Sequence, residues 1–374
     1  MSHTTKKVLL IFSGYNPRAV YAFLRTINNN GIPYAIIASS EEDSILSTSY
    51  KDKVLYIRHK KELDFPDIAN GILIIKKIIQ AESLLIAPST EGLNRFLLDA
   101  RADLEALGCI IPLVNKESYE TISDKAAFSE LCTKYGILIP REVNISKDSL
   151  PFVAKPRKYC SPDTQKALSP IIIKNINDLV SFNAKYDISD FYFQEYIDGK
   201  SIYLLYYFDR YGECYKFSQE NLIQQPGGKS IVAAISTDYH NGAMSTEYEH
   251  LFQCERYRGF VMIEVRQHNE KNYMIEANPR FWGPSQLFVD AGFNFFEVFL
   301  YDYYLRSAPP VFPQNIKSTK YFWYGGFLDA MKRNLKVDFY NTNEKKLLDE
   351  LPEWISHDIY NRDDTEYIFA KECK

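Results

Sequence analysis

Two apolar runs joined by a polar turn decide the fold of this chain: Gly259-Phe-Val-Met-Ile-Glu-Val-Arg266 and Tyr273-Met-Ile-Glu-Ala-Asn-Pro-Arg280. Their composition and spacing predict an antiparallel β-hairpin. If the turn centres on residue 270, positions 264 and 276 are equidistant from it and lie opposite each other. Glu264 and Glu276 would then have Cβ atoms about 5 Å apart, where two like charges destabilise a sheet unless a cation neutralises them.

Three polar side chains of the second run share one face of the strand, because residues two apart point to the same side. They are Glu276, Asn278 and Arg280. Mg²⁺ prefers oxygen ligands and is commonly held by one or two carboxylates plus substrate phosphates, so the set predicts a magnesium–nucleotide site beside a guanidinium. On spacing alone, a surface hairpin with one charged face is an equally good interpretation. The opposite face is expected to pack on the core through Val261, Ile263, Val265, Tyr273 and Ile275.

Further strings follow one another in a fixed order over about residues 115–300. They are Ser123-Asp-Lys-Ala-Ala-Phe128, Tyr135-Gly-Ile-Leu-Ile-Pro140, Phe152-Val-Ala-Lys-Pro156, Gln194-Glu-Tyr-Ile-Asp-Gly199, Met262-Ile-Glu264 and Ile275-Glu-Ala-Asn-Pro-Arg-Phe-Trp-Gly283. In this order and spacing the strings resemble the ATP-grasp superfamily, in particular its biotin-carboxylase and carbamoyl-phosphate-synthase-like branch. The resemblance implies an ATP-grasp fold with a mobile lid subdomain. It also implies ATP as a substrate and Mg²⁺ as a cofactor, with Mn²⁺ as an alternative metal.

The resemblance also implies a role for each matched position. Lys125 and Lys155 match the lysines that contact ATP phosphates, and an anion there would offset the cost of a charge in the buried strand Phe-Val-Ala-Lys; an ordinary exposed lysine is the alternative for Lys125. The hinge that meets the adenine edge is matched by Gln194, Glu195 and Ile197. The magnesium ligands are matched by Glu264, Glu276 and Asn278. Arg280 matches the catalytic arginine that stabilises charge developing during phosphoryl transfer.

Two positions depart from the family pattern. The lid loop after the strand lysine is normally rich in glycine, but residues 156–170 contain none. Either side chains such as Lys158, Ser161, Thr164 or Lys166 replace its backbone contacts, or the lid closes differently. The acidic residue often found after the hinge glycine, toward the ribose, is Ser201 here.

The first 114 residues alternate short apolar runs with amphipathic stretches, which predicts a Rossmann-like α/β layer with a parallel sheet. We expect strands at 8–12, 34–38, 53–57 and 84–87, with a helix around 71–80. The dinucleotide fingerprint G-x-G-x-x-G is absent after the first run, and two Gly-Lys-Ser strings lack the earlier glycine of a phosphate-binding loop. The predicted division is a pre-ATP-grasp domain at 1–114, an ATP-grasp domain at 115–308 with its lid at about 150–197, and a C-terminal extension of unknown role at 309–374.

Composition narrows the class of protein. The 44 Lys and Arg residues against 48 Asp and Glu residues give a net charge of −4, which argues against nucleic acid as a partner. Six scattered cysteines without CxxC pairs, and no long apolar run, predict a cytoplasmic protein without a membrane partner. The sequence is consistent with a homodimer. Aromatic residues make up 15% of the chain, which predicts a large core, an aromatic cleft, or both.

The expected activity is that of an ATP-dependent carboxylate–amine ligase, which activates a small-molecule carboxylate as an acyl phosphate for attack by an amine. Alternatives are a bicarbonate-activating or carbamoyl-phosphate-synthase-like enzyme and a non-catalytic ATP-binding regulator. Substrate contacts are expected around Gln219, Glu220, Gln224, Gln225 and the turn 226–228, although a solvated loop is equally consistent. Trp282 fits either the wall of a carboxylate pocket or the core.

Overall fold

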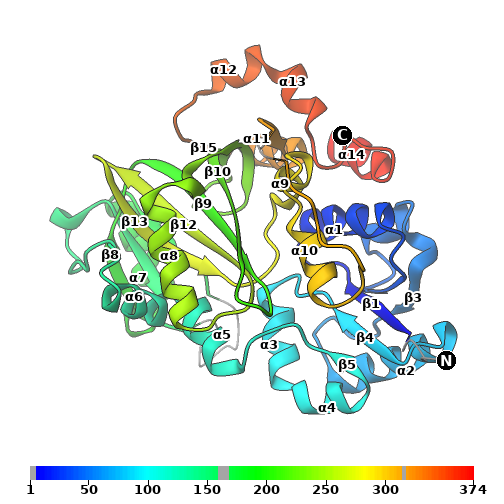
Figure 1. The fold of residues 1–374 in the computed structure, drawn as a ribbon. Coiled ribbons are helices and arrows are strands. Elements are labelled where there is room, and N and C mark those ends of the chain that lie inside the picture. The colour runs from blue at the N-terminus through cyan, green and yellow to red at the C-terminus, as the bar shows by residue number, and fades with distance from the viewer. Residues whose placement is uncertain (1–5, 159–167, 314–316) are drawn as a thin grey trace.

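A five-stranded parallel sheet forms the N-terminal part of the chain, in the order β3-β2-β1-β4-β5 (Figure 1). The computed structural model describes residues 6–158, 168–313 and 317–374. The strands are β1 Lys7–Phe12, β2 Tyr34–Ala38, β3 Val54–Ile57, β4 Ser83–Ile86 and β5 Cys109–Ile110. The four predicted strands are confirmed to within one residue at each end. β1 and β2 are buried along almost their whole length, as expected of a parallel sheet covered on both faces.

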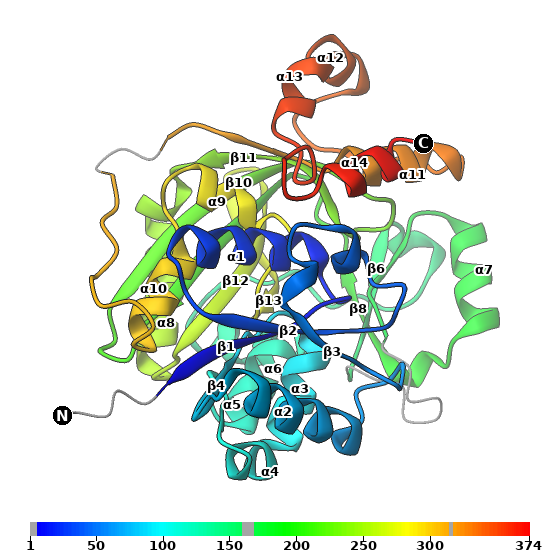
Figure 2. The same ribbon diagram turned by 90° about the vertical axis from the view of Figure 1, so that its right-hand side faces the viewer.

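Helices cover both faces of this sheet (Figure 2). They are α1 Pro17–Asn29 on one face, and α2 Phe65–Ile79, α3 Glu91–Asp99 and α4 Arg101–Ala106 on the other. α2 begins six residues before the predicted start of that helix. Its beginning is fixed by Asp64, whose side chain accepts a hydrogen bond from the backbone N–H of Asp67, and by a proline in the first turn.

A large antiparallel sheet of seven strands forms the centre of the molecule. Six strands follow the order β13-β12-β9-β10-β11-β14, and β15 pairs with β10. The strands are β9 Lys200–Phe208, β10 Cys214–Gln224, β11 Ile231–Thr237, β12 Gly259–His268, β13 Lys271–Asn278, β14 Lys320–Phe322 and β15 Asp338–Phe339. The predicted hairpin is therefore confirmed as the pair β12–β13.

Two layers of helices enclose the large sheet. They are α5 Lys116–Ser123, α6 Lys125–Lys134 and α8 Ala243–Cys254 on one face, and α9 Ser285–Asp290 and α10 Phe295–Asp302 on the other. The second face also meets α1, and a continuous aromatic cluster fills the space between them through Phe23, Phe260, Phe281, Phe296 and Phe299. Many of the aromatic residues of the chain thus belong to the hydrophobic core.

A small three-stranded antiparallel sheet, which we call the lid sheet, projects from the centre of the molecule. It consists of β6 Phe152–Pro156, β7 Ile171–Ile173 and β8 Phe191–Glu195, with β6 in the middle and α7 Ile176–Lys185 packed on one side. Of the side chains proposed to cover phosphates, Ser161, Thr164 and Lys166 lie outside the described residues.

The C-terminal segment folds over both earlier parts of the chain. Its helices are α11 Tyr324–Lys332, α12 Glu344–Asp349, α13 Leu351–Ser356 and α14 Glu366–Glu372. Two short strands of the segment, β14 and β15, join the central sheet at β11 and β10. Residues 309–374 therefore extend the central sheet and supply part of its hydrophobic packing.

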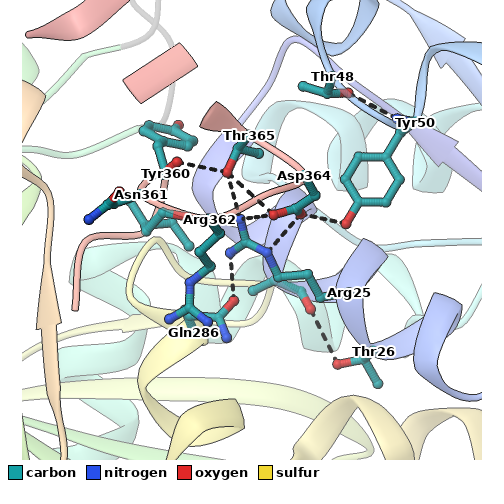
Figure 3. Close-up of polar contacts among 12 residues, drawn as sticks. Arg25, Thr26, Thr48, Tyr50, Gln286, Tyr360, Asn361, Arg362, Asp364 and Thr365 are labelled. Carbon is teal, nitrogen blue, oxygen red and sulfur yellow. Dashed lines mark hydrogen bonds and ion pairs between the residues drawn. The ribbon is translucent and has the colours of Figure 1, made fainter. Parts of the chain in front are cut away.

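One arginine links the C-terminal segment to the parallel-sheet layer (Figure 3). Arg25, on α1, donates two hydrogen bonds to the carboxylate of Asp364, at 2.8 and 3.0 Å, and a third to Gln286 Oε1 at 2.8 Å. Tyr50 O–H donates to the same carboxylate at 2.6 Å. Figure 3 shows Arg25 at the centre of this polar cluster, between residues from three distant parts of the sequence. Such charge-assisted, bidentate contacts fix the relative orientation of the elements they join.

Candidate active site

A cavity of about 440 Å³ lies between the central sheet and the lid sheet. Its walls contain all nine residues that the resemblance marks as functional: Lys125, Lys155, Gln194, Glu195, Ile197, Glu264, Glu276, Asn278 and Arg280. The structure thus brings together residues from α6, β6, β8, β12 and β13. The cavity has the size expected of a small-molecule binding site.

The hairpin register places Glu264 directly opposite Glu276, as predicted. The route to this register differs from the expected one. The turn consists of Asn269 and Glu270, both with positive φ, so the strand pairs next to the turn are symmetric about a point between these two residues. A β-bulge between Glu264 and Val265 then shifts the pairs further from the turn by one residue.

The bulge corrects one prediction. Val261, Ile263 and Val265 pack in the core as expected, but Tyr273 and Ile275 do not. Their places on the core face are taken by Met274 and Ala277, because the extra residue of the bulge reverses the alternation of side chains on β13. Ile275 instead lies in the cavity wall.

Glu276, Asn278 and Arg280 form a chain of contacts along the cavity wall. Asn278 Nδ2 donates to Glu276 Oε1 at 2.8 Å, and Arg280 Nη2 donates to Asn278 Oδ1 at 3.0 Å. Lys125 Nζ lies 2.8 Å from Glu276 Oε2. Lys125 is the first residue of α6, where the side chain of Asp124 accepts hydrogen bonds from the N–H groups of the next turn and so fixes the start of the helix.

The two opposed glutamates have different environments. Burial alone raises the pKa of Glu276, but the Lys125 ammonium, the hydrogen bond from Asn278 and the charge of Arg280 lower it to about 2. Burial raises the pKa of Glu264; Arg266 opposes this effect and the nearby charge of Glu276 adds to it. Arg266 Nη2 donates to Glu264 Oε1 at 3.1 Å. Each carboxylate therefore has one cationic group in direct contact, Lys125 for Glu276 and Arg266 for Glu264. The repulsion between the two carboxylates remains as a reason to bind a further cation.

Lys155 is 3% exposed and extends from the middle strand of the lid sheet to the hairpin. Its Nζ donates to the carbonyl oxygen of Ile275, the residue at the bulge, at 2.8 Å. Burial, followed by the charge of Lys125, lowers the pKa of Lys155 to about 8. Two ammonium groups close enough to repel each other suit a ligand with several negative charges.

The hinge residues line the cavity at the end of β8. Gln194 Nε2 donates to the carbonyl oxygen of Pro140 at 3.1 Å, whereas its Oε1 is buried and has no hydrogen-bond partner among the described residues. Glu195 pairs with Arg141 at 2.8 Å. The hinge also approaches the end of β12, since a Cβ at Gly199 would lie 2.2 Å from the carbonyl oxygen of Gln267.

Some wall residues were not singled out from the sequence. Arg266 is two residues beyond Glu264 on β12, so strand alternation could have placed it on the same face. Glu91, at the start of α3, carries no motif that would have indicated it. Lys229 follows the turn that was proposed for substrate contacts; Gly227 and Gly228 of that turn do line the cavity.

Some of the residues expected to contact the substrates do not line the cavity. Gln219 and Glu220 are buried on β10 and do not line the cavity, so they are not part of a solvated loop. Trp282 is 2% exposed and packs against Phe260, Phe288 and Phe295 in the core.

The donor set fits Mg²⁺ better than a softer metal. In the described part of the chain, no group of three or more His, Cys, Asp or Glu side chains could hold a metal ion. Glu264, Glu276 and Asn278 offer two carboxylates and an amide oxygen, and Mg²⁺ is commonly bound by so few protein ligands when substrate phosphates complete its coordination. The residues present therefore fit magnesium bound together with a nucleotide.

No family model and no curated protein matches the sequence. Solved structures do resemble the fold. The pyruvate carboxylase of Rhizobium etli aligns over 80% of this chain and 28% of its own, with 15% identity and a TM-score of 0.59. The biotin carboxylase of Campylobacter jejuni aligns over 81% and 72%, with 15% identity and a TM-score of 0.57. The N5-carboxyaminoimidazole synthetase of Staphylococcus aureus aligns over 88% and 85%, with 13% identity and a TM-score of 0.59.

These neighbours belong to the ATP-grasp superfamily. The predicted fold class is thereby confirmed: the chain has an ATP-grasp fold with biotin-carboxylase-like architecture, preceded by a parallel α/β layer. The chain spans little more than a quarter of the pyruvate carboxylase. Within the described residues, no helix combines the length and the apolar character needed to cross a membrane.

Proposed function

We propose that this chain is an ATP- and Mg²⁺-dependent ligase that joins a small-molecule carboxylate to an amine and releases ADP and phosphate. The observation that carries the proposal is the opposed pair Glu264 and Glu276, in one cavity with Asn278, Arg280 and the two lysines. The Campylobacter jejuni neighbour was solved as a complex with β,γ-ATP, which supports a nucleotide in this type of fold.

Each residue has a part that its chemistry supports. Lys125 and Lys155 bind phosphate oxygens, and the unpartnered Gln194 Oε1 accepts a hydrogen bond from the base. The two glutamates and Asn278 would hold Mg²⁺, which would offset the negative charge of the phosphates. Arg280, whose Nη2 is held by Asn278, presents a positioned guanidinium to the group being transferred.

This arrangement needs no nucleophilic side chain. Phosphorylation of the substrate carboxylate converts a poor leaving oxygen into phosphate, and the amine then forms the amide bond as phosphate leaves. The protein contributes positioning of the reactants and electrostatic stabilisation of the transition state, which together account for most of the catalysis in reactions of this kind. Five described cysteines carry free thiols, and the proposal assigns none of them a role.

The test is a substrate screen with purified protein, Mg²⁺ and ATP. ADP release should require one class of carboxylate and one class of amine together, and the product mass should equal their sum less one water. ADP release with bicarbonate in place of the carboxylate would favour the carboxylase alternative. Binding of a nonhydrolysable ATP analogue without ADP release for any pair would favour a regulator.

A further inference from the structure

Arg266 is a buried guanidinium that the family resemblance does not assign to any role. It is 8% exposed and lines the candidate active site, yet its Nη1 is buried and finds no hydrogen-bond partner within residues 6–158, 168–313 and 317–374. Its Nη2 is shared between Glu264 Oε1 at 3.1 Å and Gln224 Oε1 at 3.2 Å. An unpartnered cationic donor in a cavity wall is costly unless a ligand completes its contacts.

The C-terminal segment holds this guanidinium in place. The ring of Tyr340 lies 4.3 Å from Arg266 Cζ, in a cation–π contact. Tyr340 O–H donates to Gln224 Oε1 at 3.2 Å and accepts from Arg266 Nη2 at 3.3 Å. Tyr340 itself is fixed by its backbone N–H, which donates to the carbonyl oxygen of Leu222 at 2.8 Å just beyond β15.

The position of Arg266 on β12 indicates which part of a nucleotide it meets. It lies two residues from Glu264, about 7 Å along the strand, in the direction of the hinge at Gly199. Opposite it on β9 is Ser201, which stands where related proteins often have an acidic residue toward the ribose. Between a metal held by the glutamates and a base held at the hinge lie the ribose and the α-phosphate, and a guanidinium donor suits the phosphate.

We propose that Arg266 binds the α-phosphate of the nucleotide and that Tyr340, from the C-terminal segment, is a positioning residue for it. This inference rests on the proposed nucleotide site but not on the identity of the substrates. It gives residues 309–374 a part in the active site, because β15 carries the chain to Tyr340.

Binding of adenosine, AMP and MgADP, measured by calorimetry, tests the proposal. R266K keeps a positive charge beside Glu264, so its fold should persist, but it loses the forked donor. We expect R266K to weaken AMP and MgADP by about tenfold to a hundredfold, the range of a lost hydrogen bond to a charged group. Adenosine, which lacks the α-phosphate, should change by less than twofold.

Substitutions of Tyr340 provide a second test of the proposal. Y340L removes the ring and hydroxyl but leaves Arg266 and Glu264 intact, and it should weaken AMP and MgADP several-fold without affecting adenosine. Y340F should restore most of the lost affinity. The matched control is Y367L, at an exposed tyrosine on α14 in the same segment, which should leave all three affinities unchanged.

The outcomes separate the two proposals. Unchanged MgADP affinity in R266K, or an equal loss for adenosine and MgADP, would overturn the role of Arg266 and leave the proposed ligase standing. Wild-type protein that binds no MgADP would overturn both. The protein could also bind MgADP in a way that depends on Arg266 and yet join no carboxylate to any amine. That result would overturn the proposed ligase activity and support the role of Arg266.

Discussion

Glu276 lies between Lys125 and Asn278, with Arg280 one contact further along the wall. Because these contacts share one cavity, a change at one of them should affect chemistry more than folding. We expect Glu276→Gln and Arg280→Ala each to lower the rate of ADP formation by at least about a hundredfold while circular dichroism shows a retained fold.

Matched controls exist for both substitutions. Glu270→Gln changes an exposed glutamate in the turn of the same hairpin, and Arg333→Ala removes an exposed arginine at the end of α11. Both should keep wild-type rates. Turnover at the wild-type rate in Glu276→Gln or Arg280→Ala would show that the substituted residue is not part of the active site.

The lowered pKa of Lys155, about 8, predicts a pH dependence of nucleotide binding. Burial and the charge of Lys125 lower it, whereas Glu276 and Glu264 oppose the shift. The ammonium is present below pH 8 and is lost above it, so the Kd for an ATP analogue should be constant at lower pH and rise about tenfold per pH unit above 8. Lys155→Met should bind weakly at every pH, with no break near 8.

The exposed Lys134, at the end of α6, supplies the control. Lys134→Met should retain both the wild-type affinity and the break near pH 8. A wild-type Kd that stays flat from pH 7 to pH 9.5 would show that Lys155 is not a phosphate ligand.

Among the elements, the β12–β13 hairpin shows what sequence patterns can and cannot predict. Symmetry about residue 270 correctly paired Glu264 with Glu276. The same symmetry missed the bulge, because no residue type in Met274-Ile275-Glu276 marks an extra residue, and it therefore placed Tyr273 and Ile275 on the wrong face. The pairing of Glu264 with Glu276 is nevertheless correct, because the shift of the turn centre and the extra residue of the bulge offset each other at that point of the hairpin.

The C-terminal helix α14 carries a half-buried acid that links stability to pH. Glu372 Oε2 accepts a hydrogen bond from Trp323 Nε1 at 3.0 Å, and burial raises the pKa of Glu372 to about 7 despite that bond. The folded state thus favours the protonated acid, so its stabilising effect is complete below about pH 4.5 and is lost as pH rises through 7. Glu372→Gln should match the wild-type Tm at pH 5 and exceed it at pH 8.5.

The comparison at two pH values isolates the carboxyl group. Glu366→Gln, at an exposed position at the start of the same helix, should show the wild-type Tm at both. If Glu372→Gln lowered the Tm equally at pH 5 and pH 8.5, the carboxylate would be a stabilising partner of Trp323 at all pH values and the predicted linkage would be wrong.

Over the whole molecule, the order of motifs was enough to predict an ATP-grasp fold after a parallel α/β layer. It was not enough to place residues 309–374, which lack motifs and contain short elements whose strands pair with distant partners. Tyr340 illustrates the limit: its position beside Arg266 depends on β15 pairing with β10, more than a hundred residues earlier. The boundaries at 114 and 308 stay predictions.

Arg25 should be a main determinant of how the C-terminal segment is held. It is 11% exposed at its side chain, and Asp364 is 18% exposed. Removing one partner of such a pair leaves a largely desolvated charge, so Arg25→Met should lower the free energy of unfolding by about 3 kcal/mol. Urea denaturation would measure the change.

The control for Arg25 is Arg333, which pairs with Asp329 at the surface. Arg333→Met should change the free energy of unfolding by less than about 0.5 kcal/mol. Equal effects of the two substitutions would contradict the view that the contacts in Figure 3 hold the C-terminal segment against α1.

The central claim, a magnesium–nucleotide site built on the opposed glutamates, is tested most directly by calorimetric titration of a nonhydrolysable ATP analogue with and without Mg²⁺. Wild-type protein and Glu270→Gln should bind the analogue with one site per chain and much more tightly when Mg²⁺ is present. Glu276→Gln should lose that difference. Wild-type protein that binds no analogue, or binds it equally well without Mg²⁺, would contradict the account.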